Sequence, residues 1–181
     1  MTTHIALIRG INVGTSKRVA MADLRNALTG LGFGQVRTLL NSGNVILESD
    51  QSPKAVARAV SETLAGRLGV PAEVIVRSRG QLLAAMAADP FGPDAPDGSK
   101  HFLGCLADTP APGSAERIPE LRDPPTCAPD QARLIGRHLY LWCPAGLSAS
   151  AFAKVNWDRA LGTAVTVRNW NTMEKLIGPA A

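Results

Sequence analysis

The chain has 181 residues, of which 45% are hydrophobic, and carries a formal net charge of +4. This length fits one large domain or two small ones, and the apolar content suffices for packed cores, which argues against a disordered chain. No apolar run approaches the roughly 20 residues that cross a bilayer, and the apolar stretch before Arg9 is too short for a signal peptide, so we expect a cytoplasmic protein without membrane contact.

The first half of the sequence alternates between strand and helix patterns. The segment His4–Arg9 is apolar on both alternating sets, as in a strand covered on two sides, and apolar residues then recur at helical spacing from Ala20 to Leu31. Two β-rich segments joined around Asn41–Gly43 indicate a hairpin. A second helix opens at Ser52 and Pro53, and residues 72–78 form a fourth strand. The predicted order is β-α-β-β-α-β.

The second half repeats this order after a short helix, residues 81–88, and a loop rich in Pro, Gly and Asp, residues 89–100. Six prolines between residues 110 and 129 predict that part of this stretch is irregular. The predicted elements are a strand at 101–107, a weak helix at 114–121, a hairpin turning at Gly136, a helix at 149–161, a strand at 164–169 and a final helix capped by Asn171.

The repeated pattern predicts an α+β protein made of two tandem ferredoxin-like units (α/β plait, βαββαβ) with an added C-terminal helix. We expect the first unit at residues 1–79, a connecting helix and linker at 80–100, and the second unit with the C-terminal helix at 101–181. The sheet face without helices needs a cover in each unit. That cover is the other unit, a second copy in a homodimer, or a ligand.

The strongest local signal is the loop after the first strand, which holds Arg9, Asn12, Gly14, Lys17 and Arg18. Glycines in such a loop allow close backbone approach, amides near a helix N-terminus point at an anion, and basic side chains add charge. The spacing matches neither a Walker loop nor a dinucleotide fingerprint. An anion site and a purely structural turn explain the loop equally well.

The hairpin contains a second polar cluster, Asn41–Asn44, in which Ser42 and Asn44 flank Gly43. A turn whose side chains satisfy backbone groups explains most of it. In the predicted topology this hairpin and the first loop share one end of the sheet, roughly 10 Å apart. The two clusters could therefore flank one ligand.

A third polar cluster, Arg168–Thr172, joins the last strand to the last helix. Asn171 as a helix cap and Trp170 as a packing anchor have structural explanations. Arg168 and Asn169 are then available for an anion or for a bond between the units. We include all four among the candidate ligand-binding residues.

Aromatic side chains at His138, Tyr140 and Trp142 alternate on one face of a strand of the second unit, with Phe102 expected on the neighbouring strand. Sheets of this topology can stack nucleic-acid bases on such aromatics. Interface packing is the simpler explanation, because residues 1–80 hold ten Lys/Arg against five Asp/Glu and residues 81–181 hold nine against ten. No spacing indicates a metal site, a cofactor or a catalytic set, and the three cysteines suggest buried thiols.

Four motifs taken together are recognisable: RGINVG at residues 9–14, SGNV at 42–45, GRHLYLWCPAG at 136–146 and TVRNWNT at 166–172. They resemble the bacterial domain-of-unknown-function family numbered 1697. The resemblance implies a pair of α/β-plait domains and no established activity, substrate, cofactor or catalytic residue.

Three functional hypotheses follow. The first is a binding protein or enzyme whose small ligand carries a phosphate or carboxylate, held by the polar clusters. The second is a nucleic-acid-binding module that uses the basic first half, with an affinity that falls steeply with salt. The third is an interaction protein that dimerises through its sheet faces. Whether the protein is an enzyme is open at this point.

Overall fold

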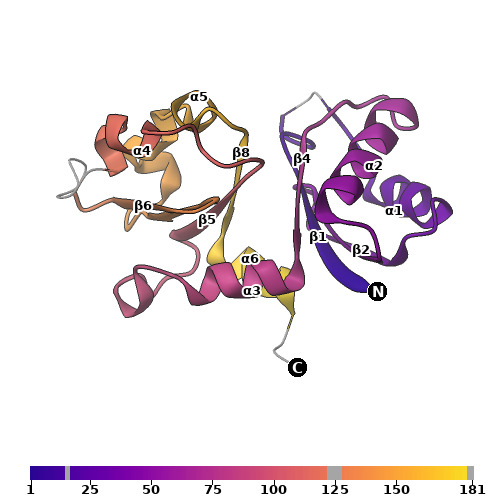
Figure 1. Cartoon of the computed structure of the whole chain (residues 1–181), viewed down its shortest axis with the longest axis horizontal. Coiled ribbons are helices and arrows are strands. Elements are labelled where there is room, and N and C mark those ends of the chain that lie inside the picture. The colour runs from indigo at the N-terminus through magenta and orange to yellow at the C-terminus, as the bar shows by residue number, and fades with distance from the viewer. Residues whose placement is uncertain (15–16, 122–127, 179–181) are drawn as a thin grey trace. The chain divides into compact units, whose positions relative to one another are not determined.

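The computed structural model describes residues 1–14, 17–121 and 128–178. The chain divides into two compact units, Met1–Ala84 and Ala85–Ala181, and each contains one four-stranded antiparallel sheet (Figure 1). Within the described residues, six α-helices accompany the two sheets. The predicted α+β class is therefore confirmed.

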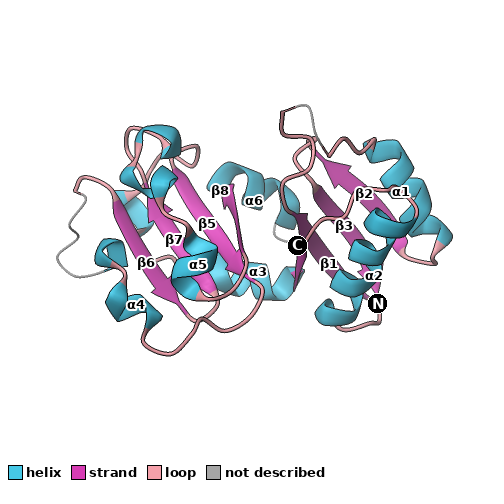
Figure 2. Ribbon diagram, turned by 90° about the horizontal axis from the view of Figure 1, so that it is seen from above, coloured by secondary structure: helices cyan, strands magenta, loops and turns pink. Residues whose placement is uncertain are grey.

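The first unit has the strand order β2-β3-β1-β4, and all neighbouring strands are antiparallel. Its helices α1 and α2 connect β1 to β2 and β3 to β4, and both lie on one face of the sheet (Figure 2). The element bounds are β1 Thr2–Ile8, α1 Met21–Gly30, β2 Gly34–Leu39, β3 Asn44–Ser49, α2 Pro53–Gly66, β4 Val74–Ser78 and α3 Arg79–Ala87.

The core of the first unit forms where an apolar stripe of α2 meets the sheet. Ser52 caps this helix, since its Oγ accepts a hydrogen bond from the Ala55 N–H at 3.3 Å, and Pro53 occupies the first helical position. This stripe packs with the strand residues into one cluster. Complete burial of each such side chain contributes about 1.5–3 kcal/mol. The fully buried members on α2 are Val56, Val60 and Leu64.

The second unit has the strand order β6-β7-β5-β8, again with antiparallel neighbours. Its connections are short helices and 3₁₀ turns, and α4 and α5 lie over one face of the sheet (Figure 2). The element bounds are β5 His101–Leu106, α4 Ser114–Arg117, β6 Gln131–Ile135, β7 His138–Trp142, α5 Trp157–Leu161, β8 Val165–Asn169 and α6 Trp170–Ile177.

The prediction of one helix over residues 149–161 is wrong. The chain forms 3₁₀ turns at Leu147–Ala149 and Ala151–Lys154 before α5. The backbone of Ser150 is extended and its Oγ accepts a hydrogen bond from the Phe152 N–H. Ser150 therefore caps the turn that follows and interrupts the predicted helix. The same hydroxyl donates to Asp130 Oδ2 at 2.6 Å inside the protein, which fixes this break.

Two other helix predictions also need correction. The helix expected at 114–121 is α4 alone, four residues long, followed by a 3₁₀ turn at Pro119–Leu121. The cap of the last helix is Asn169, because its Oδ1 accepts the Thr172 N–H at 2.9 Å, and Asn171 lies inside α6. The prolines at 124 and 125 lie outside the described residues.

Candidate functional site

The loop between β1 and α1 folds back on itself at Asn12. This residue has a left-handed φ of 55°, which asparagine tolerates better than most residues, and its N–H donates to the Lys17 carbonyl at 3.0 Å. Ile11, beside it, is buried in the core of the unit. The loop is therefore anchored at its base, while Gly14 and Lys17 are exposed.

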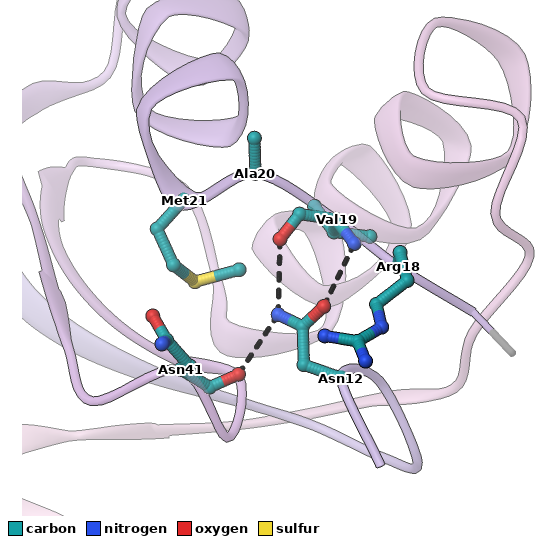
Figure 3. Close-up of a pocket in the computed structure, with 6 residues that line it drawn as sticks. All are labelled: Asn12, Arg18, Val19, Ala20, Met21 and Asn41. Atoms are coloured by element: carbon teal, nitrogen blue, oxygen red, sulfur yellow. Dashed lines mark hydrogen bonds between the residues drawn. The ribbon is translucent and has the colours of Figure 1, made fainter. Parts of the chain in front are cut away.

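The side chain of Asn12 ties this loop to two other segments (Figure 3). Its Nδ2 donates to the carbonyls of Val19 and Asn41, each at 2.9 Å, and its Oδ1 accepts the Val19 N–H at 2.9 Å. Both amide donors are thus used inside the protein. Asn12 holds the entry of α1 against the β2–β3 turn, and the predicted proximity of the two clusters is confirmed.

The β2–β3 turn packs tightly on the end of β1. The Ile8 N–H donates to the Gly43 carbonyl at 2.7 Å. Gly43 has a φ of 83°, and a Cβ there would lie 2.9 Å from the Ile8 carbonyl oxygen, so glycine is required. Asn44 is buried and its Nδ2 donates to the Leu39 carbonyl and to Ser42 Oγ. The predicted turn is confirmed, and the Asn44 side chain stabilises it through hydrogen bonds within the turn.

A pocket of about 380 Å³ opens where the loop, the turn and the start of α1 meet (Figure 3). Arg18 supplies a cation to its lining, and it has no hydrogen bond or ion pair to any residue that the structure describes. The N-cap of α1, Ala20, has no side chain that could bond the first-turn amides. The described lining residues are Asn12, Arg18, Val19, Ala20, Met21 and Asn41.

Of the six candidates predicted in this unit, only Asn12 lines the pocket within the described residues. Arg9 forms an ion pair with Glu73, with its Nη1 3.1 Å from Oε2, and its N–H donates to the Glu73 carbonyl. Arg18 and Asn41 belong to the two predicted polar clusters but were not among the residues expected to bind the ligand. Their position next to Lys17 and Ser42 was a signal, but exposure and lack of a partner are visible only in the folded chain.

The candidates of the second unit are engaged in packing. Arg168 is half-buried, and its Nη1 donates to Thr166 Oγ1 and to the Val167 carbonyl. Burial lowers the pKa of this guanidinium, and the nearby Cys105 opposes that shift. Asn169 caps α6, and the Asn171 N–H donates to the Gly98 carbonyl at 3.3 Å.

Trp170, the fourth candidate of this unit, stacks on a buried histidine that the sequence analysis did not single out. The rings of Trp170 and His101 are parallel within 5° and 4.1 Å apart, and Phe91 and Trp142 meet the imidazole edge-on. The Nε2 atom of His101 lies 3.2 Å from Asp89 Oδ1. Burial lowers the pKa of His101 despite the opposing effect of that carboxylate.

Phe102 lies on β5, the strand next to β7, as expected. Phe102 packs against the core beneath α4 and α5, on the face opposite Tyr140, because its pleat position differs by one residue from that of Leu103. Tyr140 is buried and its hydroxyl donates to the Ala85 carbonyl at 2.7 Å. Burial, with Asp89 and then Cys105 nearby, raises the pKa of this hydroxyl to about 12.

In the described part of the chain, no cluster of His, Cys, Asp and Glu has the composition of a metal site. No helix in that part is both long enough and apolar enough to cross a membrane.

These features define an α+β protein with two tandem four-stranded antiparallel units. The chain belongs to the family described as protein of unknown function (DUF1697), whose model matches residues 1–140. The predicted family is thus confirmed. GRHLYLWCPAG continues past the matched residues, and TVRNWNT lies entirely beyond them. The family has no established activity.

One similar solved structure is that of the conserved bacterial protein SP0830 from Streptococcus pneumoniae. It is 24% identical, the match covers 97% of each chain, and the TM-score is 0.70. At this identity the likeness establishes the fold alone. No curated protein matches the chain.

Proposed function

We propose that the protein binds a small ligand with a phosphate or carboxylate group in the pocket at the start of α1. The observation that carries this proposal is Arg18, an exposed guanidinium that lines the pocket and has no partner among the described residues. A guanidinium presents parallel N–H donors that match the two oxygens of a carboxylate or phosphate. Here that fork is available to a ligand.

The start of α1 supports the same chemistry. The first-turn N–H groups of a helix lack intrahelical partners, and the helix dipole favours negative charge there by about 0.3–1 kcal/mol. Ala20 offers no side-chain cap, and both Ala20 and Met21 line the pocket. Asp23, in the first turn, is not among the lining residues.

The size of the pocket also fits a small molecule. Its volume of about 380 Å³ lies in the range of roughly 300–1,000 Å³ that is typical of small-molecule sites. The proposal moves the anchoring charge from Arg9, which is paired with Glu73, to Arg18. Asn12 becomes the brace that holds the site together.

The test is a titration of the full ¹⁵N-labelled chain with inorganic phosphate and with acetate, followed by NMR. We expect the amides of residues 18–23 and of Asn41 to shift, and Arg18→Ala to abolish these shifts. Arg58→Ala is the matched control, because Arg58 is an exposed arginine of α2 in a surface ion pair with Glu62. Shifts that persist in Arg18→Ala, or that lie elsewhere, would reject the site.

We also propose that each unit is a ferredoxin-like plait. The orders β2-β3-β1-β4 and β6-β7-β5-β8 with antiparallel neighbours support this assignment, as do the helices on one face of each sheet. An experimental structure that placed the crossover segments of either unit on opposite faces of its sheet would overturn it.

A further inference from the structure

Two exposed apolar side chains stand on the loops that border the pocket. Val13 is 67% exposed and follows Asn12, and Leu40 is 56% exposed and precedes Asn41. Asn12 and Asn41 both line the pocket. Exposed apolar side chains that gather on one surface mark places where a protein contacts something apolar, whereas isolated ones do not.

The structure holds these two side chains out in a defined way. Leu40 has a left-handed φ of 59°, a conformation that is costly for a branched side chain. The two loops are joined by the 2.9 Å hydrogen bond from Asn12 Nδ2 to the Asn41 carbonyl. The loops that carry Val13 and Leu40 are therefore braced against each other at the rim of the pocket.

The wall of the pocket has the same mixed character as its rim. Val19, Ala20 and Met21 contribute apolar surface, whereas Arg18 contributes the charge. Met21 is flexible and polarizable, so it adapts to apolar groups of different shape. A ligand with only an anionic group would leave the apolar wall and rim without a contact.

We propose that the ligand is a soluble anionic amphiphile. Its phosphate or carboxylate group pairs with Arg18, and a short apolar body covers Met21 and extends to Leu40 and Val13. This inference rests on the proposed function, because it takes the anion at Arg18 as given. It adds the chemical class of the remainder of the ligand.

The test uses a series from methyl phosphate to hexyl phosphate, with binding to the full chain measured by calorimetry. Each buried methylene should tighten binding about fourfold until the apolar surface is covered. In Val13→Ser/Leu40→Ser the gain per methylene should largely disappear while methyl phosphate binds as before. Leu31→Ser is the matched control, because Leu31 is 45% exposed at the opposite end of α1.

The outcomes separate the two proposals. If phosphate and all alkyl phosphates bind equally and depend on Arg18, the pocket binds anions and the amphiphile inference is wrong. If none of them binds, both proposals fail. Binding only to vesicles that contain phosphatidic acid would show that the surface contacts a membrane and not a soluble ligand. A rise in molecular mass that the serine variant abolishes would show that it contacts a second copy of the chain.

Discussion

The two units have sheets with the same strand order but connect their strands differently. In the first unit the crossovers are regular helices of 10 and 14 residues, whereas α4 and α5 have four and five residues. The second core is completed by aromatic side chains from these broken segments, among them Phe152 and Trp157, whose rings are 6.0 Å apart. Strand pairing and core burial therefore suffice for the sheet order, and a helical crossover is not needed.

The polar clusters of the two units differ in a second respect. In the first unit, the backbone and side-chain bonds of Asn12 and Asn44 shape a pocket that leaves Arg18 available. In the second unit, Arg168 and Asn169 bond their own strand and helix. Similar polar density in a sequence thus belongs to a ligand site in one case and to packing in the other, as proposed above.

The largest effect is expected at the two hairpin turns. Gly43→Ala places a Cβ against the Ile8 carbonyl at a left-handed φ and should cost about 3 kcal/mol of unfolding free energy in the first unit. Gly136→Ala, at the turn of the second unit, has a φ of 57° with open space around it and should cost about 1 kcal/mol.

Hydrogen exchange of the strand amides can measure the two turns separately, because a chain with two units does not unfold in one transition. If Gly43→Ala and Gly136→Ala lowered the unfolding free energy equally, the left-handed backbone conformation alone would account for the destabilisation.

A smaller effect is expected at the capping serines. Ser150→Ala removes a buried hydrogen bond to Asp130 and the cap of the following turn, and should destabilise the second unit by about 2 kcal/mol. Ser52→Ala removes one exposed cap of α2 and should cost about 1 kcal/mol in the first unit. The exchange measurement applies again, and a larger loss at Ser52 would contradict the assigned roles.

Substitutions at Asn12, which braces the loop, and at Asn169, which caps α6, should differ less in their effect on stability. Asn12→Ala removes three hydrogen bonds in a half-exposed loop and should cost about 1.5 kcal/mol, together with the binding of phosphate. Asn169→Ala removes one helix cap, should cost about 1 kcal/mol, and should leave phosphate binding unchanged. Loss of binding in Asn169→Ala would contradict the assignment of the site to the first unit.

The smallest effect concerns pH and is confined to the second unit. The pKa of His101 lies below its ordinary value of 6.5 in the folded protein, so the unfolded chain binds the proton more readily. The second unit should therefore be most stable above about pH 6.5 and lose stability as the pH falls below it. His101→Phe should flatten this slope in denaturation curves, while the first unit serves as the internal control.

Much of the fold could be predicted from periodicity. Strands β1 and β3 and helices α1 and α2 follow from alternating or helical apolar spacing, which burial on one face enforces. The segment 149–161 could not be predicted, because its apolar spacing is helical but Ser150 prefers to cap, and its bond to Asp130 joins residues 20 positions apart. The face of Phe102 depends on a one-residue register that periodicity does not fix.

The site was harder to predict than the fold. The motif at residues 9–14 and the hairpin cluster pointed to the loop and turn that border the pocket, because strand topology brings their ends together. The roles of single residues depend on partners distant in sequence, such as Glu73 for Arg9 and Asn41 for Asn12. Whether a cation is paired or available is a property of the folded surface, so Arg9 and Arg18 could not be distinguished from the sequence.

The contact between Gly98 and Asn171 has a consequence for how such chains diverge. A Cβ at position 98 would collide with the Asn171 side chain, and the backbones of the two residues are already hydrogen-bonded. A side chain can therefore appear at position 98 when the exposed Asn171 side chain turns away, when position 171 carries a smaller residue or when α6 shifts. In related sequences we expect the residue at position 98 to influence which residue is found at position 171, 73 residues further along the chain.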